Sequence, residues 1–283
     1  MCPGVVKLIV IHNADRESLS ILSVGSRDIA LWDVTRGQLE FSVNLDQSVD
    51  LAVLSTASTV VICAGIQSGF IVAVSLTSGT IEHVPAAEEY RGMTDLAVSA
   101  DRIFVATAAS GVPVLSMAQY VVAGNLCDPH GGHHSVPTKL LVSGQNDGQL
   151  VVGYRHGLVQ IFDVDTLTVI SSMFGHSGTV NSLHLLPSGQ LISAADDQCA
   201  IIWNRQRCVE HESRNDVVGV SEIWTRSGLE GPQTGEELSC DVSKSEVRCY
   251  TVDSTRCLLY AGFSCGVVLV WNFYTGQFHL IYL

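Results

Sequence analysis

The sequence contains few charged residues, and basic residues are especially scarce. Only 15% of its 283 residues are charged, with 15 lysines and arginines against 28 aspartates and glutamates, which gives a formal net charge of −13. Proteins that bind nucleic acid without sequence preference need many Lys and Arg side chains to neutralise phosphates. We therefore predict no nucleic-acid partner. The acidic balance permits a partner protein with a basic surface or a basic peptide, although a soluble acidic surface is the simpler interpretation.

The sequence also lacks the marks of secretion and of a disulfide framework. Its nine cysteines are an odd number and include no Cys-x-x-Cys pair, and it has no Asn-x-Ser/Thr glycosylation site. The first residues lack the basic start and the small-residue cleavage site of a signal peptide. Reduced thiols inside the cell are the expectation, with a cytoplasmic location predicted and a nuclear one left open.

No uninterrupted apolar run is long enough to cross a membrane. Residues 51–81 carry no charge at all, but polar residues at 55–58 and 67–69 divide the segment into short pieces rich in Val and Ile. A membrane-spanning helix needs roughly 20 predominantly apolar residues. Short β-branched pieces between turn residues are typical of strands, so we predict strands and no membrane insertion.

The most informative stretch that is present covers residues 175–204. Three short apolar runs follow one another within it: 180–186, 191–195 and 199–203. A Pro-Ser-Gly turn separates the first two, and an Asp-Asp-Gln turn separates the second and third. Short apolar runs bounded by turn residues predict successive antiparallel strands.

This stretch resembles a WD repeat. The shared features are the opening Gly175-His176, the closing Trp203-Asn204 in place of Trp-Asp, and the Ser-x-x-x-Asp of Ser193 and Asp197. In that family a His, a Ser, an Asp and a Trp link the strands of one propeller blade by hydrogen bonds. The resemblance assigns this structural role to His176, Ser193, Asp197 and Trp203. Their role is therefore expected to be structural, because buried polar groups usually satisfy one another.

A repeat of about forty residues runs along most of the chain. The residues just after the third strand of each unit are Asp33, Ser75, Ser116, Asp163, Asn204 and Asn272. The intervals between them are 42, 41, 47, 41 and 68 residues. Four of these five match the roughly 40–45 residues of a four-stranded propeller blade. We predict an all-β fold, a β-propeller of four-stranded antiparallel blades, with six blades favoured and seven left open.

Residues 1–283 are predicted to form a single WD-repeat-like propeller with one irregular insertion. The long last interval places a polar insertion at 210–245, between the fifth and sixth blades. The fourth strand of the fifth blade is expected near 208–211, and an extra strand at 217–224. Residues 5–11 are assigned to an innermost strand. The chain then lacks an N-terminal outer strand that could pair with the last blade. Three explanations remain open: the ring closes by side-chain packing alone, the assignment of 5–11 is wrong, or the chain is one part of a longer propeller.

Two motifs suggest chemistry, and neither has the structural context that the chemistry needs. Ser264 lies in a Gly-x-Ser-x-Gly sequence, but this motif works between a strand and a helix, and here it joins two strands. Cys127, His130, His133 and His134 are potential zinc ligands, yet their spacing matches no tetrahedral framework, and a Pro- and Gly-rich loop is the simpler interpretation. There is no phosphate-binding loop or dinucleotide fingerprint. We predict no catalytic residue, no metal and no cofactor.

The resemblance implies a non-enzymatic scaffold or adaptor for protein–protein interactions. In such propellers the turns between second and third strands lie on the face most often used for partners. The candidate contact residues are Arg27, Tyr154, Arg155 and Asp196, together with Trp224 of the insertion. Two alternatives remain: a substrate-recognition subunit of a larger complex such as a ubiquitin ligase, and an enzyme with a site in the central channel. The enzyme needs converging titratable groups, and the inner strands supply little beyond His184.

Overall fold

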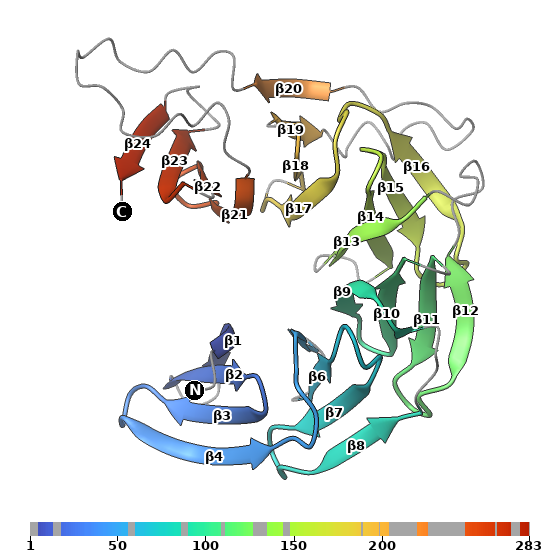
Figure 1. Ribbon diagram of the computed structural model, residues 1–283, viewed down its shortest axis with the longest axis vertical. Coiled ribbons are helices and arrows are strands. Elements are labelled where there is room, and N and C mark those ends of the chain that lie inside the picture. The colour runs from blue at the N-terminus through green and yellow to red at the C-terminus, as the bar shows by residue number, and fades with distance from the viewer. Residues whose placement is uncertain are drawn as a thin grey trace. The chain divides into compact units, whose positions relative to one another are not determined.

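The fold consists of β-sheets throughout the part of the chain that can be described. A computed structural model of the chain describes residues 5–13, 18–55, 60–85, 90–108, 111–126, 135–143, 148–187, 189–197, 199–203, 220–225, 247–263, 265–272 and 278–282. These ranges hold strands β1 to β24, arranged in six four-stranded sheets whose neighbouring strands are all antiparallel (Figure 1). The predicted all-β architecture of six four-stranded units is thereby confirmed. No helix within these ranges has the length and apolar character needed to cross a membrane.

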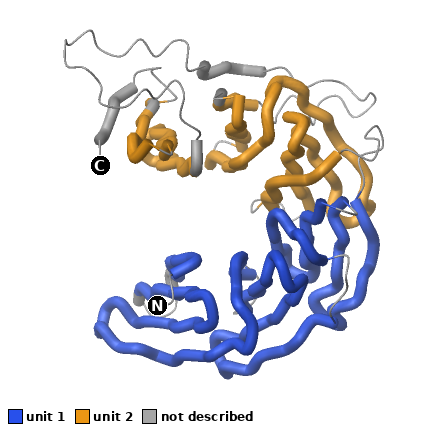
Figure 2. Tube along the Cα trace, viewed as in Figure 1, with its two compact units in different colours: residues 1–129 blue, residues 130–283 orange. Residues whose placement is uncertain are grey.

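The chain divides into two compact units, residues 1–129 and 130–283, with three sheets in each (Figure 2). Sheet one contains β1 (Val5–Asn13), β2 (Ser18–Gly25), β3 (Asp28–Asp33) and β4 (Gln38–Asn44). Sheet two contains β5 (Leu51–Leu54), β6 (Val60–Ala64), β7 (Ile71–Ser75) and β8 (Ile81–Val84). Sheet three contains β9 (Met93–Val98), β10 (Arg102–Thr107), β11 (Val112–Ser116) and β12 (Val122–Leu126).

The second unit repeats this plan. Sheet four contains β13 (Pro137–Val142), β14 (Gln149–Tyr154), β15 (Val159–Asp163) and β16 (Val169–Met173). Sheet five contains β17 (Val180–Leu185), β18 (Leu191–Ala195), β19 (Cys199–Trp203) and β20 (Val220–Thr225). Sheet six contains β21 (Val247–Asp253), β22 (Leu258–Phe263), β23 (Val267–Asn272) and β24 (Phe278–Tyr282). Strands follow one another across every sheet in chain order, as short hairpin connections require.

The fourth strand of sheet five is not where the sequence analysis placed it. Strand β20 pairs with β19 along its whole length, with Ala200 opposite Trp224. Residues 220–225 therefore complete the fifth sheet, and no extra strand is needed to explain them. The segment 208–211 and the remainder of the predicted insertion at 210–245 lie outside the described residues. The sequence analysis did expect a strand at 217–224, but the polar residues between it and β19 led to its assignment as an extra strand of the insertion.

Consecutive sheets within each unit are held together by apolar faces. Sheets one and two share a core that includes Leu22, Val24, Ile29, Leu31, Val61, Cys63, Val72 and Val74. Sheets four and five share Val151, Val159, Ile161, Met173, Leu183, Leu191, Ile201 and Trp203. Because successive residues of a strand point to opposite faces, each central strand can pack against the sheet before it and the sheet after it. This explains why the central strands are almost continuously apolar, like the fully buried Leu191–Ala195 of β18.

Polar side chains also cross between neighbouring sheets. Thr138 Oγ1 donates a hydrogen bond to the carbonyl oxygen of Val180 at 2.6 Å, which links sheet four to sheet five. The Tyr250 hydroxyl donates to the carbonyl oxygen of Ala195 at 3.3 Å, which links sheet six to sheet five. In the first unit the ammonium group of Lys7 donates to the Ala52 carbonyl oxygen at 2.8 Å. These bonds fix the register between sheets that apolar packing alone would leave free to slide.

Candidate functional site

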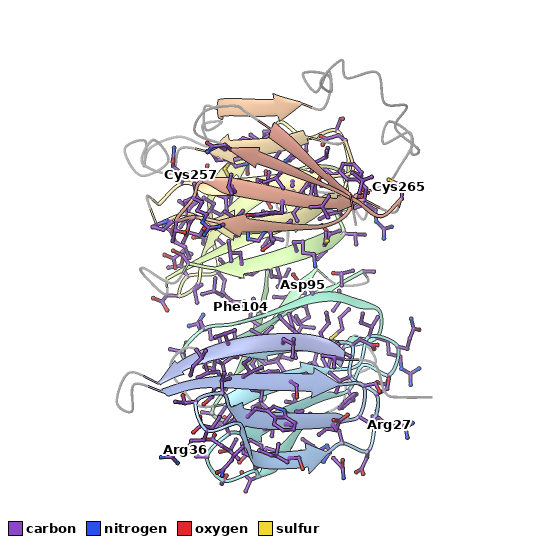
Figure 3. The ribbon with its side chains drawn as sticks, turned by 90° about the vertical axis from the view of Figure 1, so that its left-hand side faces the viewer. Arg27, Arg36, Asp95, Phe104, Cys257 and Cys265 are labelled. Atoms are coloured by element: carbon purple, nitrogen blue, oxygen red, sulfur yellow. The ribbon has the colours of Figure 1, made fainter. Side chains whose placement is uncertain are left out.

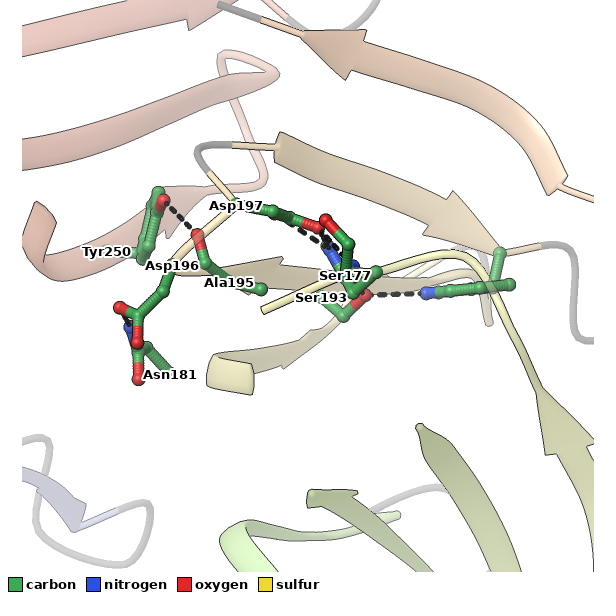
Figure 4. A network of polar contacts seen from close by, with 9 residues as sticks. Ser177, Asn181, Ser193, Ala195, Asp196, Asp197 and Tyr250 are labelled. Carbon is green, nitrogen blue, oxygen red and sulfur yellow. Dashed lines mark hydrogen bonds and ion pairs between the residues drawn. The ribbon is translucent and has the colours of Figure 1, made fainter. Parts of the chain in front are cut away.

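The loop that joins β16 to β17 is tied to sheet five by a set of buried polar side chains. His176 Nδ1 lies 3.0 Å from Asp197 Oδ2, and His176 Nε2 lies 2.7 Å from Ser193 Oγ. Trp203 Nε1 donates to the same Ser193 Oγ at 2.7 Å. Figure 4 shows Ser193 and Asp197 among the polar contacts around this loop. The structure thus joins the four residues named by the resemblance into one continuous chain of hydrogen bonds, which we call the tetrad.

The chemistry of the donors fixes the direction of every bond in the tetrad when the imidazole is neutral. An indole N–H can only donate, so Ser193 Oγ accepts from Trp203. The Ser193 hydroxyl then has its single proton left to donate to His176 Nε2. This places the imidazole proton on Nδ1, from which it is donated to the carboxylate of Asp197. Each buried polar atom along this chain of bonds is therefore satisfied, and the tetrad uses these groups for structure.

Two glycines allow the loop to approach the sheet closely. A Cβ added at Gly175 would lie 3.0 Å from Trp203 Cη2 and 2.9 Å from Ile201 Cδ1. A Cβ added at Gly178 would lie 2.6 Å from the backbone nitrogen of Asp197. Between these glycines, the Ser177 backbone N–H donates to Asp197 Oδ2 at 2.8 Å. Residues 175–178 are therefore held at each position by packing or by a hydrogen bond.

The turn between β14 and β15 rests against this loop. Gly157 has a φ of +90°, and a Cβ added there would lie 2.3 Å from the carbonyl oxygen of His176. The neighbouring turn of sheet four thus lies against the backbone of the residue at the centre of the tetrad. Only glycine combines this conformation with this approach.

Replacing Gly157 with alanine is expected to lower the free energy of unfolding by about 2 kcal/mol, because the left-handed conformation alone costs about 1 kcal/mol and the contact adds to it. Gly37→Ala is the matched control, since Gly37 has a φ of +64° but no atom within 4 Å of an added Cβ. Denaturant unfolding of both variants separates the two contributions. Equal losses in the two variants would show that the approach to His176 contributes nothing.

The candidate contact residues are exposed in some cases and buried in others. Arg155 and Asp196 are exposed in the turns that follow β14 and β18, and His156 is exposed beside Arg155. In the first unit Arg27 is exposed in the turn after β2, at the opposite end of sheet one from Arg36 (Figure 3). Asp196 accepts a hydrogen bond from Asn181 Nδ2, so part of its carboxylate is occupied within sheet five.

Tyr154 corrects the sequence-based expectation. Its side chain is only 2% exposed, and its ring centroid lies 5.7 Å from that of His156. The side chain points into the fold because it ends β14, whose last five residues are all buried. A partner cannot reach Tyr154 in this arrangement, so the direct contact predicted for it is wrong. The backbone of Trp224 lies in β20, and its side chain is outside what the structure describes.

The residues that suggested chemistry lie outside the described residues. These are Cys127, His130, His133 and His134, and Ser264. Within the part of the chain that is described, no group of three or more His, Cys, Asp or Glu side chains is placed to hold a metal ion.

His184 lies on β17, and its pKa is shifted from the ordinary value of a histidine. Its Nε2 lies 2.8 Å from Ser182 Oγ. Removal of the side chain from water lowers the pKa of His184 below its ordinary value of 6.5, and a hydrogen bond with the Tyr250 backbone opposes this effect. The neutral imidazole is thus the form that sheets five and six accommodate.

Acidification below pH 6.5 is expected to destabilise the protein through His184, since the unfolded chain binds a proton there more readily than the folded chain does. The free energy of unfolding should rise with pH from the folded-state pKa up to 6.5, and this group should add no pH dependence above that value. Urea titrations at about pH 5.5 and about pH 7.5 measure the effect. His184→Gln is the control and should show a smaller difference between the two pH values; an unchanged difference would contradict the assignment.

Phe174, which sequence reasoning missed, is 57% exposed at the end of β16. The signal that could have drawn attention to it is a large aromatic residue directly before the Gly-His pair, where the other residues of the connection are small or polar.

Parts of the sequence are similar to a known family model and to known proteins. Residues 167–204 match the family model described as WD domain, G-beta repeat. A segment of 79 residues is 29% identical to p21-activated protein kinase-interacting protein 1-like from Gallus gallus, and covers 28% of this chain and 21% of that protein. A segment of 121 residues is 25% identical to eukaryotic translation initiation factor 3 subunit I from Culex quinquefasciatus, and covers 40% of this chain and 37% of that protein. The matched segments therefore span well under half of either relative.

Solved structures share the fold over nearly the whole chain. The β-propeller domain of Cps50 (Swd1) from Myceliophteria thermophila superposes with a TM-score of 0.72 and 13% identity, and the match covers 96% of this chain and 85% of that domain. The C-terminal WD40 domain of Sif2 gives a TM-score of 0.69 and 17% identity, with 94% and 66% covered. The resemblance to WD-repeat propellers noted from the sequence is confirmed, and the six sheets are the blades of a six-bladed propeller fold.

Proposed function

Because this chain has the propeller fold of WD40 proteins and carries a WD repeat over strands β16 to β19, we propose that it is a non-enzymatic platform for protein–protein interactions. The observation that carries the proposal is that one group of its polar residues is buried and structural while another is exposed. His176, Ser193 and Trp203 are buried and bonded to one another, whereas the charged residues Arg155 and Asp196 are exposed in the turns beside them. Exposed turns on a rigid framework are where binding residues concentrate.

The names of the two relatives support a protein partner. One is named as a protein that interacts with a kinase, and the other as a subunit of a translation initiation factor. Each name describes association with another protein. The net charge of −13 favours a partner whose overall balance is basic, since complementary charge speeds encounter between proteins. A cytoplasmic location fits such a role.

Affinity capture of the tagged full-length chain from cells, with identification by mass spectrometry, tests the proposal. The test variant combines Arg27→Glu, Arg155→Glu and Asp196→Lys. Arg36→Glu is the control because Arg36 is exposed at the other end of sheet one (Figure 3). Partners should be enriched by the wild-type chain and by the control, and be lost from the triple variant at an unchanged unfolding temperature. Failure of the wild-type chain to enrich any protein above a tag-only sample would reject the platform function.

A further inference from the structure

Phe174 exposes an apolar surface where the fold does not require one. Among the described side chains of the second unit, it alone is a large apolar residue with high exposure, at 57%. Met173 pairs with Val159, as Val43 pairs with Ile29 in sheet one and Val84 with Ile71 in sheet two. The residues that follow, equivalent to Phe174, are Asn44 and Pro85, and both are exposed. This position is therefore a surface position of every sheet compared, and only sheet four fills it with an aromatic ring.

The backbone that carries Phe174 is fixed on both sides. Met173 before it is fully buried in the core between sheets four and five. Gly175 after it packs against Trp203, and His176 is bonded within the tetrad. An aromatic side chain on a fixed backbone loses little conformational entropy when a partner covers it, and this is the property of an interface anchor.

A cation is carried by the turn that lies against the loop of Phe174, since a Cβ added at Gly157 of that turn would lie 2.3 Å from the carbonyl oxygen of His176. Phe174 continues β16 beyond the Met173–Val159 pair, and the turn that carries Arg155 and His156 leads directly into β15, the partner strand. The structure gives the Arg155 guanidinium no ion pair or hydrogen bond with a described residue. The carboxylates of the neighbouring turn are engaged, since Asp196 accepts from Asn181 and Asp197 from His176. The positive charge of Arg155 is thus available to a group outside the chain.

We propose that Phe174 and Arg155 anchor a partner through a segment that carries both a large apolar side chain and an aspartate or glutamate. The apolar side chain covers the Phe174 ring, and the planar guanidinium of Arg155 receives the carboxylate through two parallel hydrogen bonds. This inference rests on the proposed platform function and names the chemistry of its partner. The acidic charge of the whole chain acts on the partner's whole surface, whereas Arg155 acts at contact distance, where screening by salt is weakest.

Selection from a random-peptide display library against the purified full-length chain tests this pairing. Peptides that combine Phe, Trp or Leu with Asp or Glu should be enriched. Synthetic copies of an enriched peptide should bind Phe174→Ala and Arg155→Glu roughly tenfold more weakly than wild type, as for interface anchors in general. Val122→Ala is the control, because Val122 is a 51% exposed apolar residue in the first unit. Its affinity for the peptide should be unchanged.

Three results would overturn the inference. The first is that wild type enriches no peptides over an immobilised double variant that carries both Phe174→Ala and Arg155→Glu. The others are enrichment of basic peptides and an unchanged peptide affinity in both single variants. The cellular capture experiment separates this failure from failure of the platform function. Partners that the double variant still captures would leave the platform function in place and remove only the Phe174–Arg155 anchor. The absence of any captured partner from wild type would reject both.

Discussion

Trp203→Ala is expected to lower the free energy of unfolding by about 3–5 kcal/mol, as truncation of a fully buried aromatic side chain does. The Trp203 side chain is 0% exposed and packs in the core that joins sheets four and five. Its removal leaves a cavity against Gly175 and takes away the hydrogen bond to Ser193. Because domains are stable by only about 5–15 kcal/mol, this loss would consume a large part of the total. Urea unfolding followed by circular dichroism measures it.

Trp32 provides an internal control for this prediction. It has the same place in sheet one, pairing with Ile21 as Trp203 pairs with Leu191, and its Nε1 donates to Ser23 Oγ at 3.2 Å. However, Trp32 is 43% exposed. Trp32→Ala should therefore cost about 1 kcal/mol, since much less apolar area returns to water. If both variants lost the same free energy, the burial of Trp203 between sheets four and five would not be the cause.

The comparison of these two tryptophans also shows what the sequence could predict and what it could not. The forty-residue spacing and the turn residues predicted the four-stranded sheets, because both depend on local chemistry: β-branched runs form strands, and Gly37 and Gly79 supply the positive φ of hairpin turns. The exposure of a given residue depends on the neighbouring sheet, which is a tertiary property. The sequence therefore presents Trp32 and Trp203 alike, and only the structure separates them.

The same limit applies to the candidate site. The resemblance named the tetrad, because its members lie at fixed spacings within one repeat. It assigned Tyr154 to the surface from its position in a turn, although Tyr154 ends a strand whose last five residues are all buried. It passed over Phe174, because one aromatic residue in an apolar sequence carries no sign of its exposure until its neighbours are placed. Strand β20 was expected as an extra strand because its residues indicate a strand but not which strand it pairs with.

Ser193→Ala is expected to cost about 3 kcal/mol although it removes a single oxygen, because a buried group left without its partner loses about 1–3 kcal/mol. Ser193 is 0% exposed and serves two partners, so the variant leaves both the Trp203 N–H and His176 Nε2 without their bonds. The imidazole is then held only through Asp197 and Ser177, and the loop that carries Phe174 loses part of its support.

The matched control for this substitution is Ser23→Ala in sheet one. Ser23 accepts from Trp32 in the same way, but Trp32 is partly exposed, so water can replace the lost oxygen. We expect a loss of about 0.5 kcal/mol there. A second comparison uses Ser193→Thr, which keeps the hydroxyl and should recover much of the loss if hydrogen bonding is the cause. A loss in Ser193→Ala no larger than in Ser23→Ala would show that the tetrad is dispensable for stability. A retained loss in Ser193→Thr would instead assign the effect to packing around β18, since a hydroxyl that restores no stability cannot have supplied it.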